Sequence, residues 1–274
     1  MLWVPKKGRL RVEHNTGIVG SASIGPAVTT GASAGTKGAV TELFASTLFD
    51  AYWMQIIAGN YGAGVTASEG MVDILIGAAT EEVLIPNLLM GYCASGVGKV
   101  WSFPLYIPAG SRLAAASAGA RVSTAVFIGI YLFGGDGIPP FRIGSKVVTY
   151  PTAPSVPRGL AITPGASGAE GAWTQVVAAT SEDHFALVPS FQVETDTTTQ
   201  VRRYAFDIGI GAAAAEEEIA QSYWFDQDSS EEMKGMYPNM PTFCDVPSGT
   251  RLAARVSNSG SNDAAYGCMI HAVS

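Results

Sequence analysis

Nine consecutive residues of this chain occur twice with little change. Ile107–Ala115 reads IPAGSRLAA and Val246–Ala254 reads VPSGTRLAA, so six of the nine positions are identical. Asp73–Gly77 (DILIG) likewise returns as Asp207–Gly211 (DIGIG). The two repeats have similar offsets, 139 and 134 residues. A period this long predicts a duplicated domain and excludes a solenoid of short repeats.

The repeat divides the chain into four parts. Residues 1–24 form a basic N-terminal arm, 25–133 the first copy, 134–158 a linker rich in proline and glycine, and 159–274 the second copy. Proline at this density favours extended polyproline geometry. We therefore expect the linker to be a semi-rigid spacer that holds the two copies at a preferred separation.

Alternating apolar residues predict strands throughout both copies. In the first copy, Tyr52, Met54 and Ile56 alternate with other residues, and similar short runs recur between turns rich in glycine, proline, serine and aspartate. The Pro-x-Gly step of the repeated nine residues suits a tight reversal between two strands. About seven strands per copy is the size of a β-sandwich. We expect an all-β protein of two tandem, duplicated β-sandwich or jelly-roll-like domains.

Composition and charge restrict the classes of partner. Only 14% of the residues are charged, against roughly 25% in an average soluble domain, which indicates a surface partly covered by protein. The net charge of −7 combines +3 on the arm with −10 on the second copy. Neither folded copy is basic, which argues against a nucleic-acid partner. Ala125–Phe133, the longest apolar run, is about half a membrane span, so we expect no membrane insertion.

Known catalytic and cofactor motifs are missing from the sequence. The three histidines have no metal-ligand spacing, and Cys93, Cys244 and Cys268 form no CxxC pair. We expect free buried thiols, no cofactor and no enzymatic activity. A glycan-cleaving enzyme stays open as an alternative, because two carboxylates far apart in sequence could converge in a sandwich.

Two pairs of charged residues occupy equivalent positions in the copies. Asp73 matches Asp207, and Arg112 matches Arg251. We expect a structural Asp–Arg ion pair in each copy that bridges neighbouring strands. Catalytic aspartates are the competing interpretation.

One acidic loop offers oxygen ligands that calcium could use. Asp226, Asp228 and Glu231 lie close together, but the loop lacks the glycine and the glutamate spacing of an EF-hand. The competing interpretation is a solvated acidic loop without a metal.

The two copies differ most in their apolar segments. The last strand of the first copy, Thr124–Phe133, is apolar on both faces, as in a strand buried on both sides. The second copy instead carries Tyr223, Trp224 and Phe225 beside the acidic loop. These aromatics could form a platform on which a sugar ring stacks. We expect the first copy to be embedded against partners and the second to face water.

The Gly- and Ala-rich copies, with the DIxIG strand and the IPAGSRLAA turn, resemble structural proteins of tailed bacteriophage virions. The resemblance covers the chain from about residue 25 to its end and implies β-sandwich modules that coat a capsid or attach to a tail. Such proteins often form symmetric oligomers. No stalk of coiled coil or repeats is present, which argues against a complete long tail fibre.

These observations predict a virion structural protein, made in the host cytoplasm. The arm and the first copy would anchor it, and the second copy would face solvent, in either a tail-associated short-fibre component or a head decoration protein. Its partners would be other virion proteins, copies of itself and, as a further option, a host-surface glycan. The alternative function is a carbohydrate- or receptor-binding module that uses the aromatics of the second copy.

Overall fold

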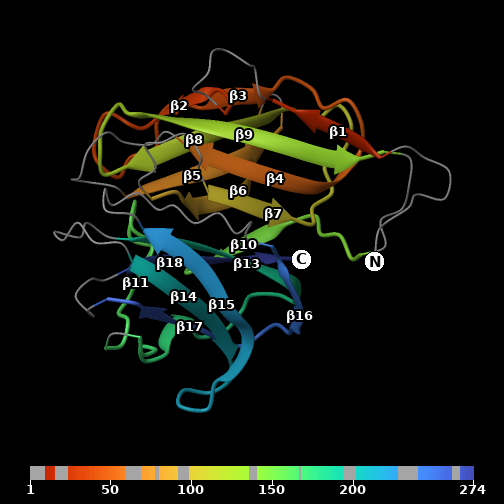
Figure 1. Ribbon diagram of the computed structural model, residues 1–274. Helices are drawn as coiled ribbons and strands as arrows, with labels where there is room; N and C mark the ends of the chain where they lie inside the picture. Colours follow the sequence, from red (N-terminus) through yellow and green to blue (C-terminus); the bar gives the residue numbers. More distant parts are fainter. Residues whose placement is uncertain are drawn as a thin grey trace.

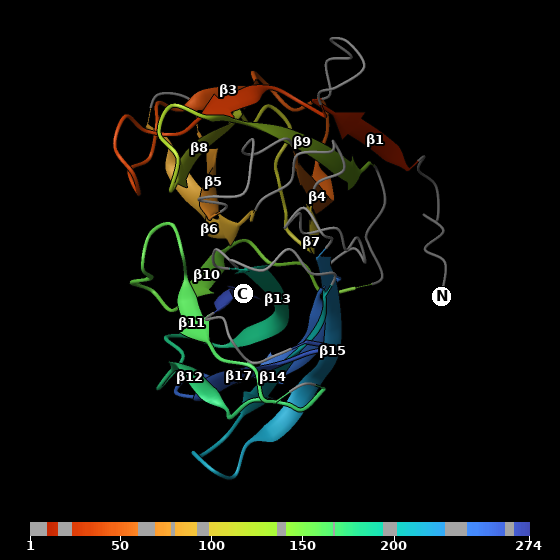
Figure 2. The same cartoon turned by 60° about the vertical axis from the view of Figure 1, so that its left-hand side comes forward.

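In the computed structural model the described residues form eighteen strands and no helix. They are residues 10–15, 24–59, 69–77, 80–91, 99–135, 141–166, 168–193, 202–227, 240–260 and 266–274. Each half of the chain builds one β-sandwich, and the two sandwiches lie one above the other in both views (Figure 1 and Figure 2). Because the described part lacks a helix, it contains none long and apolar enough to cross a membrane.

The first sandwich consists of two antiparallel sheets around one core. Sheet 1a has the order β1-β9-β4-β7, with β2 pairing on β9, and sheet 1b has the order β3-β8-β5-β6. The strands are β1 (Arg11–His14), β2 (Ala27–Thr29), β3 (Thr41–Phe44), β4 (Ala51–Gly59), β5 (Gly70–Ile76), β6 (Glu82–Leu89), β7 (Lys99–Phe103), β8 (Leu113–Gly119) and β9 (Ala125–Gly134).

The second sandwich has the same construction. Sheet 2a has the order β10-β18-β13-β16, with β11 pairing on β18, and sheet 2b has the order β12-β17-β14-β15. The strands are β10 (Val147–Tyr150), β11 (Leu160–Ile162), β12 (Thr174–Val177), β13 (His184–Val193), β14 (Arg202–Ile210), β15 (Glu217–Gln227), β16 (Thr242–Val246), β17 (Leu252–Asn258) and β18 (Tyr266–Val273).

The two halves share one topology. Adding nine to each strand number of the first sandwich reproduces the strand order of the second in both sheets. Register irregularities coincide too: pairing shifts after Val72 and Ile74 in the β5–β6 ladder, and after Phe206 and Ile208 in the β14–β15 ladder. The predicted all-β sandwich architecture is confirmed. Gene duplication would explain the shared order and stays a prediction.

The repeated nine residues form the same turn in both halves. Gly110 and Gly249 have φ angles of 82° and 83°, a region that side chains with a Cβ adopt at a cost. The Thr47 hydroxyl donates to the carbonyl of Pro108 at 2.8 Å, and the Thr180 hydroxyl donates to that of Pro247 at 2.8 Å. The turn therefore recurs because the fold around it recurs.

Each sandwich has an apolar core built from the alternation of its strands. Inward-facing residues such as Met54 and Trp101 in the first core and Phe191 and Phe206 in the second are fully buried. Burying one such side chain contributes roughly 1.5–3 kcal/mol. The cores therefore account for much of the stability of each sandwich.

The predicted linker does not separate the sandwiches. Within residues 134–158, Val147–Tyr150 form β10, which pairs with β18 of the second sandwich. The spacer prediction was wrong because it weighed the prolines and overlooked the apolar alternation between them. The predicted arm also contributes to the fold, since Arg11–His14 pairs with β9 as the edge strand β1.

Instead, the two sandwiches share a buried interface. Strand β6 contacts β10, β13 and β18, and β7 contacts β13. Val147, Val188 and Val273 of sheet 2a belong to the same apolar cluster as the first core. Both views place β6 and β7 directly above the strands of sheet 2a (Figure 1 and Figure 2). Sheet 2a is thus covered on both faces.

Candidate functional site

The outer face of sheet 1a carries half-exposed apolar side chains. Residues along β4 and β9 alternate, so that Met54 and Ile56 are fully buried while their neighbours point away from the core. The outward set is intermediate in exposure and consists of Trp53, Gln55, Ile57, Phe127, Tyr131 and Phe133. None of these side chains is charged. Such a face is typical of surfaces that bind protein or an uncharged ligand.

A groove of about 320 Å³ opens on this face. Its wall contains the rings of Tyr52, Trp53, Phe133 and Phe141, and Met240 of the second sandwich lines it too. The Trp53 and Phe141 rings meet edge to face, with centroids 5.4 Å apart. Because flat aromatic rings dominate its wall, the groove suits a ring-shaped or apolar group.

One polar group of the groove lacks a partner. Ser102 lines the groove and is fully buried, and its hydroxyl makes no hydrogen bond within the described part of the chain. An unsatisfied buried hydroxyl costs about 1–3 kcal/mol. A ligand with a hydroxyl or carbonyl group would supply the missing bond.

A second pocket, of about 410 Å³, lies at the junction of the sandwiches. Glu69, only 2% exposed, lines it together with Arg158, whose Nε lies 3.4 Å from the Glu69 carboxylate. Gln192 also lines it, with both polar atoms of its amide occupied by backbone groups. Glu69 is the sole carboxylate among the described lining residues. The described lining therefore shows one carboxylate and not the pair that most glycosidases use.

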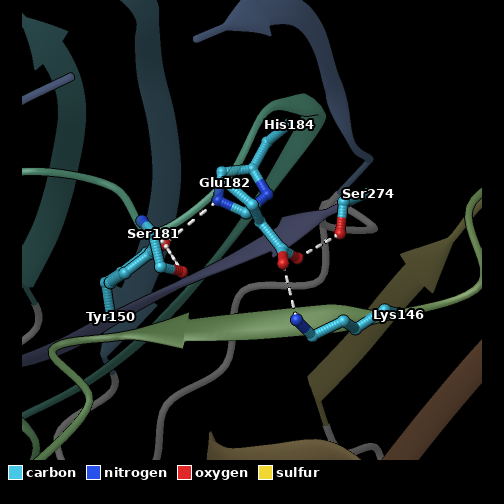
Figure 3. Close-up of polar contacts among 6 residues, drawn as sticks. All are labelled: Lys146, Tyr150, Ser181, Glu182, His184 and Ser274. Carbon is cyan, nitrogen blue, oxygen red and sulfur yellow. Dashed lines mark hydrogen bonds and ion pairs between the residues drawn. The ribbon is translucent and has the colours of Figure 1, made fainter. Parts of the chain in front are cut away.

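A hydroxyl and imidazole cluster lies at the corner before β13 (Figure 3). The Tyr150 hydroxyl lies 3.1 Å from Nε2 of His184 and 3.0 Å from Oγ of Ser181, and it accepts the Ser181 N–H at 2.9 Å. Burial lowers the pKa of His184, so its imidazole is neutral at pH 7. The Tyr150 hydroxyl contacts both the serine hydroxyl and the imidazole, so among these three residues His184 is joined to Ser181 through Tyr150. The cluster fixes the corner.

The same corner is tied to the end of the chain through Glu182 (Figure 3). Its two carboxylate oxygens accept from Nζ of Lys146 and from the hydroxyl of Ser274, each at 2.6 Å. These two hydrogen bonds hold the pKa of Glu182 below its usual range. Lys146 and Ser274 are also joined through their backbones. The contacts fasten β10 and β18 to the corner, which is a structural role.

The predicted sugar platform does not form. Tyr223, Trp224 and Phe225 follow one another along β15, so alternation sends their side chains to different sides. Phe225 is 2% exposed and packs against Phe191 in the second core, while Trp224 is 48% exposed. The Tyr223 hydroxyl donates to the carbonyl of Met240 at 3.2 Å. Only Trp224 of the three presents its ring to solvent.

The predicted Asp–Arg pairs have other partners in the first sandwich. Arg112 binds Glu42 with 2.8 Å between Nε and Oε2, and it also forms an ion pair with Glu81. Asp73 forms an ion pair with Lys37. All five groups take part in ion pairs, but Asp73 and Arg112 do not pair with each other.

The second sandwich shows why the pairing was wrong. Asp207 lies opposite Arg255 in the β14–β17 ladder and binds it at 3.0 Å, whereas Arg251 binds Glu216 at 2.9 Å. Arg251 is four residues from Arg255, which is roughly 13 Å along a strand. The shared sequence spacing identified equivalent positions in the two copies, but the strand register determines which side chains form an ion pair.

The predicted calcium loop lies mostly outside the described residues. Asp228 and Glu231 are among those not described, and Asp226 lies 3.7 Å from Nε of Arg203. Within the described ranges, no three His, Cys, Asp or Glu side chains are grouped as metal ligands would be.

Two of the three predicted free thiols can be placed. Cys268 is buried and Cys244 half-buried, and both are free, while Cys93 lies outside the described residues. Burial raises the pKa of Cys244 to about 11 and also raises that of Cys268. Both groups are therefore protonated and unreactive at neutral pH.

Sequence reasoning missed the polar residues of the sandwich junction. Gln192 accepts from the backbone N–H groups of Gly70 and Gly91, each at 3.1 Å. His271 lies 2.8 Å from the hydroxyls of both Thr149 and Ser190. The available signal was a polar residue on the outer face of an otherwise apolar strand, which indicates a face covered by another polar surface.

Comparison with known proteins gives no sequence match and weak structural likenesses. No family model and no curated protein sequence matches the chain. Among solved structures, PNGase F, a glycosylasparaginase from Flavobacterium meningosepticum, has 8% identity and a TM-score of 0.34 over 96% of each chain. PNGF-II has 6% identity and a TM-score of 0.33, over 97% of this chain and 64% of that one.

These structures correct one expectation from the sequence. The expectation of no enzymatic activity is contradicted, because PNGase F is an enzyme. The likeness is too weak to carry an argument about the activity of this chain. Any catalytic role has to be argued from its own residues.

Proposed function

We propose that the chain is a structural protein of a tailed-phage virion. The arm and the first sandwich hold it in the particle, and the second sandwich faces solvent. Its partners are other virion proteins and copies of itself, and it is a tail-associated short-fibre component or a head decoration protein. The proposal begins from the repeated IPAGSRLAA turn and the Gly- and Ala-rich copies, which resemble such proteins.

The outer face of sheet 1a is the observation that carries the proposal. Six outward side chains on β4 and β9 are uncharged and partly exposed, and five of them are apolar or aromatic. Contact surfaces are enriched in aromatics and depleted in charge at their centres. A permanent partner on this face would remove it from water.

The charge distribution supports the orientation. Residues 159–274 carry a net charge of −10, and residues 1–24 carry +3. An acidic domain remains hydrated and soluble, whereas a short basic arm is attracted to acidic protein surfaces. The second sandwich is therefore the half suited to the solvent side of a particle.

Electron microscopy of purified virions tests the proposal. Gold-labelled antibody against residues 159–274 should mark intact particles, because this half faces solvent. Dense label over the head identifies a decoration protein, and label confined to the tail identifies an appendage. Unlabelled virions that also lack the chain by mass spectrometry would refute the structural role.

The groove on sheet 1a favours a second candidate function, the binding of a glycan. Trp53 and Phe133 offer stacking surfaces, and the buried Ser102 hydroxyl needs a partner that a sugar hydroxyl could be. A glycan array should then show binding that is lost in Trp53→Ala. Trp224→Ala is the matched control on the other sandwich and should bind like the wild type. A folded protein that binds no glycan on the array would refute this candidate.

A further inference from the structure

The junction inside the molecule shows how a sandwich edge covers a sheet face. The Ser190 hydroxyl of sheet 2a accepts the N–H of Leu89 on edge strand β6 at 3.3 Å. The Thr149 hydroxyl donates to the β6 carbonyl of Pro86 at 3.0 Å. Met269 of sheet 2a packs against Leu89 in a buried apolar cluster. At this junction, the backbone groups of edge strand β6 find hydrogen-bond partners, and its apolar side chain Leu89 is buried at the same time.

Both surfaces of this junction recur elsewhere in the molecule. By topology, the outer face of sheet 1a corresponds to that of sheet 2a, and the edge strand β15 corresponds to β6. Leu89 lies opposite Met71 and Trp224 lies opposite Ala205 in the matching ladders, which makes Trp224 the counterpart of Leu89. Leu89 is 0% exposed, whereas Trp224 is 48% exposed.

We propose that the β15–β16 edge of one molecule docks on the outer face of sheet 1a of the next. The contact repeats, between copies, the junction that already exists within each chain. This inference rests on the proposed structural role and names the partner of that face as a second copy of this protein.

Side-chain volumes on the two surfaces fit each other. In the internal junction, a leucine on the edge (Leu89) meets a methionine on the sheet (Met269). The counterpart of Met269 is Gly129, because Ile57 pairs with Gly129 as Ser190 pairs with Met269. The edge residue is large (Trp224) where the sheet residue is small (Gly129). In the proposed contact, the large Trp224 side chain would therefore occupy space that the small Gly129 leaves open.

Polar groups also stand at corresponding places. In the junction, Thr149 pairs in register with His271, and Thr149 also binds the β6 backbone. Their counterparts in sheet 1a, His14 and Tyr131, pair in the same register, with ring centroids 5.5 Å apart. The Tyr131 hydroxyl and the His14 imidazole can bond to the backbone of β15, the edge strand of sheet 2b.

Charge favours the same contact. Strand β15 begins with Glu217, which is exposed, whereas Glu216 and Glu218 are paired within the chain with Arg251 and Arg255. The sheet that receives it begins at Arg11, which is exposed too. Opposite charges on the two surfaces accelerate their association and favour the correct register.

The contact joins two different surfaces and is therefore heterologous. Repetition of such a contact closes a ring or continues as a filament, and it leaves one free edge and one free face on every incomplete assembly. Variants blocked at the edge and at the face should therefore complement each other when mixed, which distinguishes this contact from a two-fold symmetric dimer.

The test uses two variants of the full chain. Trp224→Glu blocks the edge, and Ile57→Glu blocks the face at a position where the second sandwich has a polar residue, Ser190. Val122→Glu is the control, because Val122 is 48% exposed, as Trp224 is. Mass is measured by light scattering after gel filtration, and folding is checked by circular dichroism.

We expect the wild type and Val122→Glu to form oligomers and each blocking variant to be monomeric. An equal mixture of Trp224→Glu and Ile57→Glu should give a complex of two chains and nothing larger, because one intact edge meets one intact face. A monomeric wild type, blocking variants that keep the wild-type mass, or a mixture that stays monomeric would each overturn the inference. None of these outcomes affects the localisation of the protein on virions, which is measured separately.

Discussion

The outer faces of sheets 1a and 2a occupy the same place in two equivalent sandwiches, yet they differ in burial and in polar content. In sheet 2a the strands β13 and β18 are buried on this face and carry the polar residues Ser190, Gln192 and His271 among apolar ones such as Val188 and Met269. In sheet 1a it is half-exposed and carries apolar groups such as Ile57 and Tyr131. The buried face contains polar residues because it covers the backbone of edge strand β6, whose N–H and C=O groups need hydrogen-bond partners. The difference indicates that the side chains on such a face depend on the surface that covers them.

The largest expected effect comes from breaking the covered face at Gln192. Its amide accepts from the N–H groups of Gly70 and Gly91 and donates to the carbonyls of Pro157 and Arg158. Gln192→Ala removes all four bonds, and each buried backbone group left unsatisfied costs about 1–3 kcal/mol. Because Gln192 also lines the junction pocket, water can replace part of the loss. We expect urea unfolding to show a stability lower by about 4 kcal/mol.

The matched control for this change is Gln55→Ala, on the outer face of sheet 1a. Gln55 is half-exposed, so the change should alter stability by less than about 0.5 kcal/mol. Equal losses at Gln55 and Gln192 would contradict the contrast between the covered and the open face.

A pH titration sharpens the comparison through His271. Burial lowers the pKa of this histidine from 6.5 to about 3, so the folded state holds it neutral between two hydroxyls. The unfolded chain therefore binds more protons than the folded one between these two values. Stability should be fully present above pH 6.5 and fall by about 1.4 kcal/mol per pH unit below it, which is about 3 kcal/mol by pH 4.5.

The measurement is the unfolding free energy of wild type and His271→Gln across this pH range. The variant should lack the part of the slope that His271 contributes. The control is His14→Gln on sheet 1a, at the counterpart of Thr149, which should keep the part of the slope that His271 contributes. A wild-type slope unchanged by His271→Gln would show that this histidine does not govern the acid sensitivity of the junction.

The features that were predicted correctly from the sequence depend on residues close together in the chain. The features that were missed depend on strand register or on which surface covers a sheet face. The turn at Gly110 and Gly249 and the sandwich strands follow from residue types that are close in the chain. The pairing of Asp207 with Arg255 does not, because a shift of a few residues along β17 selects a different arginine. The burial of Phe225 beside exposed Trp224 follows from strand alternation, which the grouping of three adjacent aromatics overlooked. The junction joins strands distant in sequence, so its polar residues gave only a weak signal.

The third prediction compares the ion pairs of the two sandwiches. Arg255 binds Asp207, Glu170 and Glu218 and lies over the Trp173 ring at 4.4 Å, with its side chain 19% exposed. Replacing Arg255 with Met leaves a buried carboxylate without its arginine, and we expect a loss of about 2.5 kcal/mol in chemical unfolding.

The first sandwich uses a weaker arrangement at the equivalent aspartate. Lys37 pairs with Asp73 there, and both side chains are more exposed, at 29% and 15%. Because solvent screens this pair, Lys37→Met should cost about 1 kcal/mol or less. A larger loss at Lys37 than at Arg255 would reverse the expected order of the two sandwiches.

The smallest expected effect concerns the repeated turn, where the same substitution should destabilise both sandwiches equally. Gly110 and Gly249 occupy the same turn with φ angles of 82° and 83°, and a Cβ added to either would meet no atom within 4 Å. The cost of Gly→Ala at each is therefore purely that of the left-handed backbone, about 1 kcal/mol. Thermal unfolding of the two single variants should give equal shifts within error. Asparagine, which tolerates this conformation better than alanine, should recover part of the loss at both turns. Unequal losses of stability would mean that the two turns differ in the unfolded state or in their surroundings. The two halves would then not be equivalent even within the repeated nine residues.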